Sequence, residues 1–456
     1  MRKASHPTDF YQHIWGLLIP IVVQNLLSAA VSSTDVVMLN FVGQSSISAV
    51  SLASNYASIL FMVYYGLGTG ATLLCAQYFG KGDFRAIAIV EGIALRFSLG
   101  LSVLAAAAAF FAPDWMMRLF TNDPELIAIG AGYLRVMGVT YICWSVIEIY
   151  LSVLRSVGRA TVCMALNIVA FGLNILLNAV FIFGLLGAPR LGAVGVAIAT
   201  ALSRLVELTL CLIVSARSKD VKLEISCLFA RNPALQKDFV SRAIPALLND
   251  LSWGVAFSMY SVILGHLGND AVAANSLIVV VRNIGTTFCF AVASAGGILL
   301  GNVMGKGDME KARDYASHMM RLTVLSGFGG GLLILLCIPG ILRFADLSGT
   351  AMGYLKNMLL INSYYVIGAA VNTSLIAGVF RAGGDTRFGM ICDTIDMWCY
   401  AVPLGFFAAF VLKLPVMWVY FLLCTDEFVK WPWVIRRYLS GKWMQNITRD
   451  DLYENG

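Results

Sequence analysis

Long uninterrupted runs of apolar residues restrict most strongly how this chain can fold. An α-helix of about 20 apolar residues crosses the ~30 Å hydrocarbon core of a bilayer. Twelve runs of this kind occur, at residues 14–39, 46–78, 86–112, 124–154, 160–186, 191–216, 239–265, 271–304, 312–343, 350–380, 386–412 and 414–438. They are rich in Ala, Leu, Val and Gly and lack strict alternation of apolar and polar residues. Membrane-spanning helices, and not barrel strands, are therefore predicted.

The composition of the whole chain leads to the same class. Hydrophobic residues make up 59% and charged residues 13% of the 456 residues, whereas a soluble domain carries about 25% charged residues. We therefore predict an all-α membrane protein and exclude a cytosolic enzyme, a disordered protein and a disulfide-rich secreted module. The net charge of +6 is too dilute for a nucleic-acid partner. The ten Cys lie in or beside apolar runs without a CxxC pair, which is typical of buried, reduced thiols.

Lys and Arg gather in alternate loops, and this asymmetry predicts the orientation in the membrane. The rich set of loops contains Lys81, Arg85, Arg155, Arg159, Arg217, Lys219, Lys222, Arg231, Lys237, Arg242, Lys306, Lys311, Arg313, Arg381 and Arg387. The opposite set contains Arg118, Arg190, Arg343 and Lys413. We expect a multi-pass protein of the plasma (inner) membrane with both termini in the cytoplasm.

The second half of the chain repeats the first. With a shift of 225 residues, the GKGD sequence at 80–83 falls on the GKGD sequence at 305–308, and with a shift of 226 Arg155 falls on Arg381. Six crossings in each half give both copies the same orientation. We predict two six-helix lobes related by a pseudo-twofold axis along the membrane normal, with a cleft between them. The predicted parts are an N-lobe (1–216), a cytoplasmic linker (217–238) and a C-lobe with its cytoplasmic tail (239–456).

Several motifs, in their order along the chain, are similar to one transporter family. They are SSTDVVMLNFVG, the two GKGD turns, LNILLNAVFIFG, GAVGVAIATALSR, RAGGDTRFGM and TDEFVKWPWVIRRY. With them the chain resembles the multidrug and toxic compound extrusion (MATE) family from about residue 14 to residue 445. The resemblance implies a twelve-helix secondary antiporter, not an enzyme, that exports drug-like, often cationic, small molecules. It implies no cofactor other than the coupling ion, H⁺ or Na⁺.

Polar residues in the first lobe are the candidates for ion coupling. Asp35 lies deep in the first apolar run with no basic residue within two helical turns, and an unpaired carboxylate there suits H⁺ or Na⁺. Asn174 and Asn178 are four residues apart and share one helix face, and Thr200 adds a hydroxyl. The resemblance implies that these four positions form the N-lobe cation site. Asn178 stands where many relatives carry an acid, which favours H⁺. Hydrogen bonding between helices is the alternative role of the Asn pair.

The second lobe offers three acids of its own. Asp250 lies five residues after Pro245, and Asp393 and Asp396 share one helix face. The tenth apolar run contains no acid, so the C-lobe Na⁺ site of some relatives is not reproduced. Asp393 and Asp396 are candidates for a proton-sharing pair or for the anchor of a cationic substrate. The open alternative is that they are solvated near the cytoplasmic mouth.

The other charges in the apolar runs are predicted to form ion pairs within single helices. Arg204 and Glu207 are three residues apart, and Asp426 and Glu427 both lie within reach of Lys430. A helix that carries its own countercharge inserts at lower cost.

The sequence contains no motif of the enzyme classes or of an ATP-driven pump that we compared with it. The chain has no HExxH and no G-x-S-x-G motif, and GNVMGKGD lacks the spacing of a phosphate loop. A lipid-linked precursor flippase of related architecture remains the alternative, but it would need a strongly cationic cavity. We expect a monomer surrounded by membrane lipid, because one chain supplies both halves of the cleft, and no metal beyond Na⁺ at Asp35.

Overall fold

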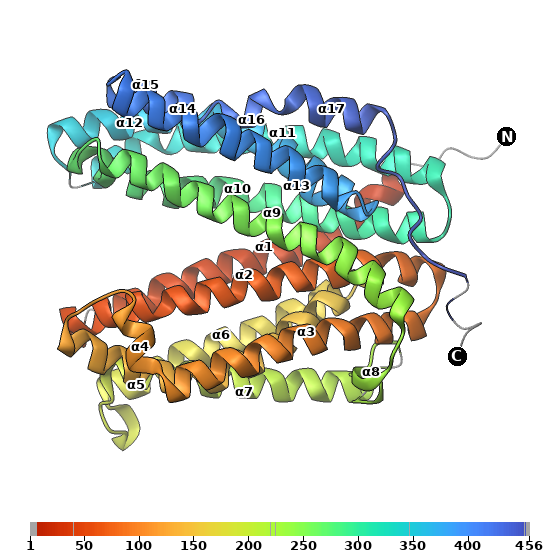
Figure 1. Ribbon diagram of the computed structural model, residues 1–456, viewed down its shortest axis with the longest axis horizontal. Coiled ribbons are helices and arrows are strands. Elements are labelled where there is room, and N and C mark those ends of the chain that lie inside the picture. Colours follow the sequence, from red (N-terminus) through yellow and green to blue (C-terminus); the bar gives the residue numbers. More distant parts are fainter. Residues whose placement is uncertain are drawn as a thin grey trace. The chain divides into compact units, whose positions relative to one another are not determined.

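The computed structural model describes residues 7–39, 41–218, 220–223, 225–345, 347–450 and 452, and its regular elements are all helices (Figure 1). Two compact units divide these residues. The first unit comprises the described parts of 19–243 and 449–456, and the second unit those of 1–18 and 244–448. Helices α1 (Pro7–Leu39) and α9 (Pro233–Gly265) each have residues in both units.

In the first unit, one central helix contacts most of the others. It is α5 (Pro124–Ser156), which packs against α2, α3, α4 and α7, while α6 packs along α7. The bounds are α2 (Gln44–Lys81), α3 (Phe84–Phe111), α4 (Pro113–Arg118), α6 (Ala160–Phe183), η1 (Leu185–Gly187), α7 (Gly192–Arg217) and α8 (Ile225–Phe229). Tyr64, Met117 and Tyr141 are fully buried where these helices meet.

In the second unit, α10 (Asn269–Gly305) packs against α11 (Met309–Phe344), α12 (Gly349–Thr373) and η2 (Ser374–Phe380). The remaining elements are α13 (Thr386–Ile395), η3 (Asp396–Ala401), α14 (Val402–Phe406), η4 (Phe407–Val411), α15 (Val416–Leu423), α16 (Asp426–Val429) and α17 (Trp431–Leu439). Figure 1 shows α13 and α14 following one another along one line in the blue part of the chain.

Eleven helices among the described residues are long and apolar enough to cross a membrane. Over the predicted twelfth span, 414–438, three short helices follow one another, α15, α16 and α17. Pro432 at the start of α17 has no backbone N–H, which favours a new helix there. Leu104, Phe111 and Leu336 are at least 70% exposed, as expected of side chains that face lipid. The protein is therefore an all-α, multi-pass membrane protein.

Three wide, π-helical segments interrupt the helices of the second unit, η2, η3 and η4. In η3, the Val402 N–H bonds the Met397 carbonyl, five residues earlier. Pro403, next in the chain, has no N–H to donate to the carbonyl of Cys399, four residues earlier, and we attribute the widening of η3 to it. Such segments are rare and often lie at functional sites.

The repeated GKGD sequence makes the same turn in both units. Gly82 and Gly307 have φ angles of 84° and 80°, in the left-handed region that favours glycine. The following carboxylates, Asp83 and Asp308, cap the next helix, each accepting a backbone N–H at 3.0 Å. The internal repeat thus holds at the level of individual hydrogen bonds.

We predict that Asp83→Ala lowers the free energy of unfolding by about 1 kcal/mol, because the N-terminus of α3 loses its side-chain acceptor. Asp83→Ser keeps an acceptor and should stay near the wild type. The check is the thermal unfolding midpoint of the purified protein. Equal losses in both variants would show that the cap is not the cause.

Candidate functional site

Three carboxylates of the second unit surround one buried ammonium group. Lys430 Nζ lies 3.1 Å from Asp393 Oδ1, 3.3 Å from Glu427 Oε2 and 3.6 Å from Asp396 Oδ2. We call these four residues the acidic cage. Asp393 comes from α13, Asp396 begins η3, and Glu427 and Lys430 belong to α16 and its C-terminal cap. The cage therefore joins two separate helical segments through one Lys.

The side chains of the cage are almost fully buried. Their exposed fractions are 6% for Asp393, 3% for Asp396 and 2% each for Glu427 and Lys430. Asp393 and Asp396 are thus not solvated at the surface of the second unit. If every carboxyl were ionised, two negative charges would be left unbalanced, and an unbalanced buried charge costs several kcal/mol. The cage therefore has the electrostatic character of a cation-binding site.

Polar groups on neighbouring helices hold the acids of α16. Glu427 accepts hydrogen bonds from Asn372 Nδ2 at 2.6 Å and from the Tyr365 hydroxyl at 3.5 Å. Asp426, predicted from the sequence to reach Lys430, accepts one from the Tyr260 hydroxyl at 3.0 Å. Glu427 is thus the α16 acid that pairs with Lys430, whereas Asp426 is bound to α9.

A cavity of about 60 Å³ adjoins the cage. Its polar lining includes Asn249, Asp250, Asn372, Asp393, Arg381, Glu427 and Lys430, and its aromatic lining Trp253 and Phe290. Among the described residues, Asn249 Oδ1 and Asn372 Oδ1 have no hydrogen-bond partner, although both side chains are at least 95% buried. Two acceptors are therefore left for water or a small ligand in the cavity.

Asp250 lies at the same cavity but is already paired. Its two carboxylate oxygens accept from Arg381 at 2.5 and 3.3 Å. This forked contact joins α9 to the end of η2 and balances the charge of both groups. Of the three acids predicted in the second lobe, Asp393 and Asp396 come together, and Asp250 has a partner of its own.

The first unit holds a chain of buried amides. Asn178 Nδ2 donates to Asn174 Oδ1 at 3.3 Å, and Asn174 Nδ2 donates to Thr200 Oγ1 at 3.2 Å. The Thr200 hydroxyl donates to the Val196 carbonyl at 3.0 Å. Three of the four residues predicted for the N-lobe site are thus in contact. Asp35 belongs to α1, but its side chain lies outside the described residues.

A single ion pair on α7 offers a contrast with the cage. Arg204 and Glu207 pair at 2.6 Å, as predicted, and the Arg204 guanidinium lies over the Trp144 ring at 5.1 Å. Glu427 and Lys430 have the same spacing of three residues, with the acid first. The α7 pair consists of one acid and one base, whereas Lys430 contacts three acids. Acids therefore outnumber the base at Lys430, in the second unit, but not at Arg204.

Sequence reasoning missed three ion pairs of Lys430 and Arg381 that cross between helices. It placed Lys430 in an ion pair within its own helix and gave Arg381 no acid partner. A signal was present, because a Lys and an Arg in or beside apolar runs both need a countercharge. The apolar run before Arg381 contains no acid, which points to an acid on a neighbouring helix, whereas the run of Lys430 supplies Asp426 and Glu427 and gives no such signal.

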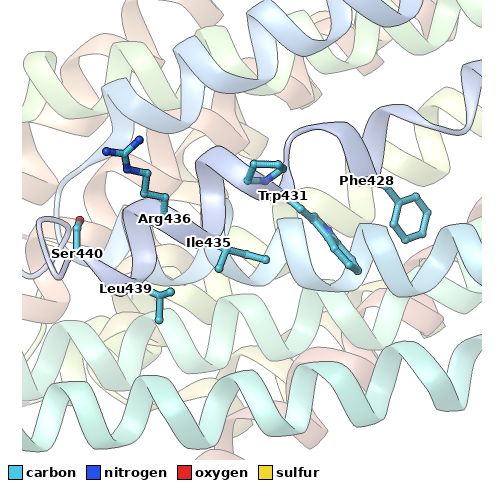
Figure 2. A pocket seen from close by; sticks show the side chains of 7 residues that line it. Phe428, Trp431, Ile435, Arg436, Leu439 and Ser440 are labelled. Carbon is cyan, nitrogen blue, oxygen red and sulfur yellow. The ribbon is translucent and has the colours of Figure 1, made fainter.

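A larger pocket of about 710 Å³ lies along α17 (Figure 2). Its lining consists of Phe428, Trp431, Pro432, Ile435, Arg436, Leu439 and Ser440. Trp431, Ile435 and Leu439 recur every four residues and so lie on one face of the helix. This pocket is apolar and has no acid, so it lacks the chemistry of a cation site.

Comparison with protein families finds a match over most of the chain. The sequence model of the MatE family matches residues 20–180 and 245–407. The two stretches correspond to the two copies of the internal repeat.

Individual proteins are similar over nearly their whole length. The chain is 22% identical to the uncharacterized transporter YisQ of Bacillus subtilis, with 96% of both chains covered. It is also 22% identical to the probable multidrug resistance protein NorM of Thermotoga maritima, with 96% of this chain and 95% of that protein covered. A solved outward-facing conformation of a multidrug resistance MATE family transporter superposes with a TM-score of 0.84 at 20% identity, covering 97% and 100%. At this identity the superposition shows the shared fold.

We predict that Lys430→Met destabilises the protein by about 3 kcal/mol or more, because three buried carboxyls lose their countercharge. The double variant Lys430→Met with Glu427→Gln removes one acid as well and should recover part of that loss. The thermal unfolding midpoints of the purified variants measure both effects. If the double variant were less stable than Lys430→Met, charge balance would not explain the loss.

Proposed function

The chain belongs to the MatE family, the multidrug and toxic compound extrusion transporters, and on this premise we propose that it is a secondary antiporter. It exports drug-like, cationic small molecules in exchange for H⁺. Matches to multidrug resistance proteins along nearly the whole chain support efflux of this kind. The family consists of transporters, so the protein is not an enzyme.

The observation that carries the cationic substrate class is the excess of buried acid in the second unit. The cavity beside the cage combines ionisable carboxyls with the rings of Trp253 and Phe290. Carboxylates attract an ammonium group by charge, and ring faces attract it through the cation–π interaction. A drug-sized molecule needs about 300 Å³ or more, whereas this cavity offers about 60 Å³. In this conformation it therefore suits a small cationic group.

The proposed coupling site is the N-lobe set, Asp35 with Asn174, Asn178 and Thr200. The three described members are linked by hydrogen bonds, which supports a common role. A proton requires one carboxyl group, whereas Na⁺ requires about five or six oxygen ligands in a defined cage. Asp35 is the acid of the set, and this favours H⁺ as the coupling ion.

The flippase alternative is less well supported. A lipid-linked pyrophosphate would need free cationic groups in the cavity. Arg381 is paired with Asp250, and Lys430 with the three acids of the cage. The bases at this cavity are thus already neutralised.

We also propose the membrane, the orientation and the oligomeric state of the transporter. The bias of Lys and Arg between loops supports a plasma (inner) membrane protein with both termini in the cytoplasm. A monomer in lipid is sufficient, because the chain carries both copies of the repeat.

We predict that Asp35→Asn abolishes ion-coupled export, because an amide cannot bind and release the coupling proton. The measurement is efflux of a fluorescent cation from cells at equal membrane abundance of the protein. Glu125→Gln, at the exposed start of α5, is the matched control and should export normally. Wild-type export by Asp35→Asn would contradict the proposed coupling site.

The coupling ion can be tested in proteoliposomes. We predict that an imposed H⁺ gradient drives the fluorescent cation across the membrane, whereas a Na⁺ gradient at equal pH on both sides does not. A protonophore should abolish the H⁺-driven movement. Robust Na⁺-driven movement that resists the protonophore would overturn the choice of H⁺.

A further inference from the structure

The acids of the cage differ in how well their negative charge is stabilised. Asp393 lies nearest to Lys430, at 3.1 Å. Glu427 has Lys430 at 3.3 Å and accepts a further hydrogen bond from Asn372 at 2.6 Å. Asp396 lies farthest, at 3.6 Å, and neither of its oxygens has a hydrogen-bond partner among the described residues. Asp396 is therefore the carboxyl whose ionised form is least supported.

A proton fits this site better than a metal ion. Lys430 occupies the point where the three carboxyls converge. Among the described residues, no group of three or more acidic, His or Cys side chains is placed to hold a metal ion. A proton on one carboxyl removes one of the two excess negative charges without needing any further ligand.

The surroundings offer a route for that proton. The adjoining cavity of about 60 Å³ exceeds the ~10–15 Å³ that one water requires. The unpartnered oxygens of Asn249 and Asn372 provide acceptors for such water. Asp393, Glu427 and Lys430 line the cavity and belong to the same cage as Asp396. A water molecule in this cavity would thus lie beside the side chains that surround Asp396.

Two wide helical turns adjoin the cage. Asp396 is the first residue of η3, and η2 begins two residues after Asn372. A π-helical turn places one extra residue in the turn, so a change of pairing there moves its side chains. The backbone that carries Asp396 thus has a local means of changing its distance from Lys430.

We propose that Asp396 carries an exchangeable proton and is a second coupling site of the antiporter, with Lys430 as the fixed countercharge that keeps Asp393 and Glu427 ionised. This inference rests on the proposed function. The proton leaves the Asp396 carboxyl for water in the cavity, and the carboxylate formed is balanced by a bound cation. Proton and cationic substrate therefore compensate the same charge in turn, which makes their binding mutually exclusive.

Other charged and titratable groups lie around the cage and its cavity, and their charges influence the titration of Asp396. They are Asp250, Tyr260, Arg282, Tyr365, Arg381, Cys392, Asp393, Tyr420, Cys424, Asp426, Glu427 and Lys430. Asp250 and Arg381 neutralise each other. Arg282 lies over the Phe257 ring at 4.6 Å and adds one positive charge beyond the cage. The Asp393, Glu427 and Lys430 charges lie nearest and dominate.

The test uses the full-length protein in lipid nanodiscs and infrared spectroscopy of the carbonyl stretch of protonated carboxyl groups. We expect the difference between the wild-type and Asp396→Asn spectra to contain one carboxyl band at neutral pH that alkali removes, and Glu125→Gln, at the exposed start of α5, to keep the wild-type spectrum. Adding methylammonium, a cation small enough for the cavity, at constant pH should reduce the wild-type band by about one carboxyl per protein and release about one proton to the medium. Unfolding midpoints of both variants serve as the control for folding.

Three results would overturn the proposal. They are a spectrum of Asp396→Asn that keeps every wild-type carboxyl band, a band that Glu125→Gln removes instead, and a wild-type band that responds to Na⁺ at constant pH. The spectrum reports protonation without transport, so its failure is distinct from failure of the proposed function. If vesicles show Na⁺-driven efflux while Asp396→Asn still lacks the band, the proton site stands and the choice of coupling ion fails.

Discussion

Charge balance in a medium without water is the constraint on which the rest of the structure depends. A carboxylate or ammonium group in a membrane helix needs a partner from the protein, because the bilayer core offers none. Arg204 finds Glu207 one turn along its own helix. Lys430 instead draws acids from two helical segments. In the second unit, this one ammonium group organises the packing of α13, η3 and α16.

The internal repeat shows how one architecture can take on two roles. The GKGD turns keep the same φ angles and the same capping bonds in both units, because they serve folding. The charged positions of the last helices have diverged, from a balanced pair on α7 to an acid-rich cage around Lys430. If one copy of the repeat is specialised for ion binding, its charged residues must differ from those of the other copy, while the turns needed for folding stay the same.

The fold was predicted to a large extent from the sequence, since spanning helices depend on local composition. Eleven of the expected spans appear as long apolar helices among the described residues. The ion pair of Arg204 with Glu207 was predicted correctly, because a spacing of three residues fixes proximity within one helix. The division of 414–438 into three helices was not predicted, because the effect of buried charges and of Pro432 depends on the helices packed around them.

Apolar run length, the bias of Lys and Arg and the repeated turns are local properties, and they were enough to identify a duplicated helical membrane protein. The partners of Lys430 and Arg381 were decided only by tertiary packing. Helices that are distant in sequence come together in the folded protein, and their polar side chains must then satisfy one another in a low-dielectric interior. For that reason Asp250 pairs with Arg381, while Asp396 is left within a cage whose charge a single Lys does not balance.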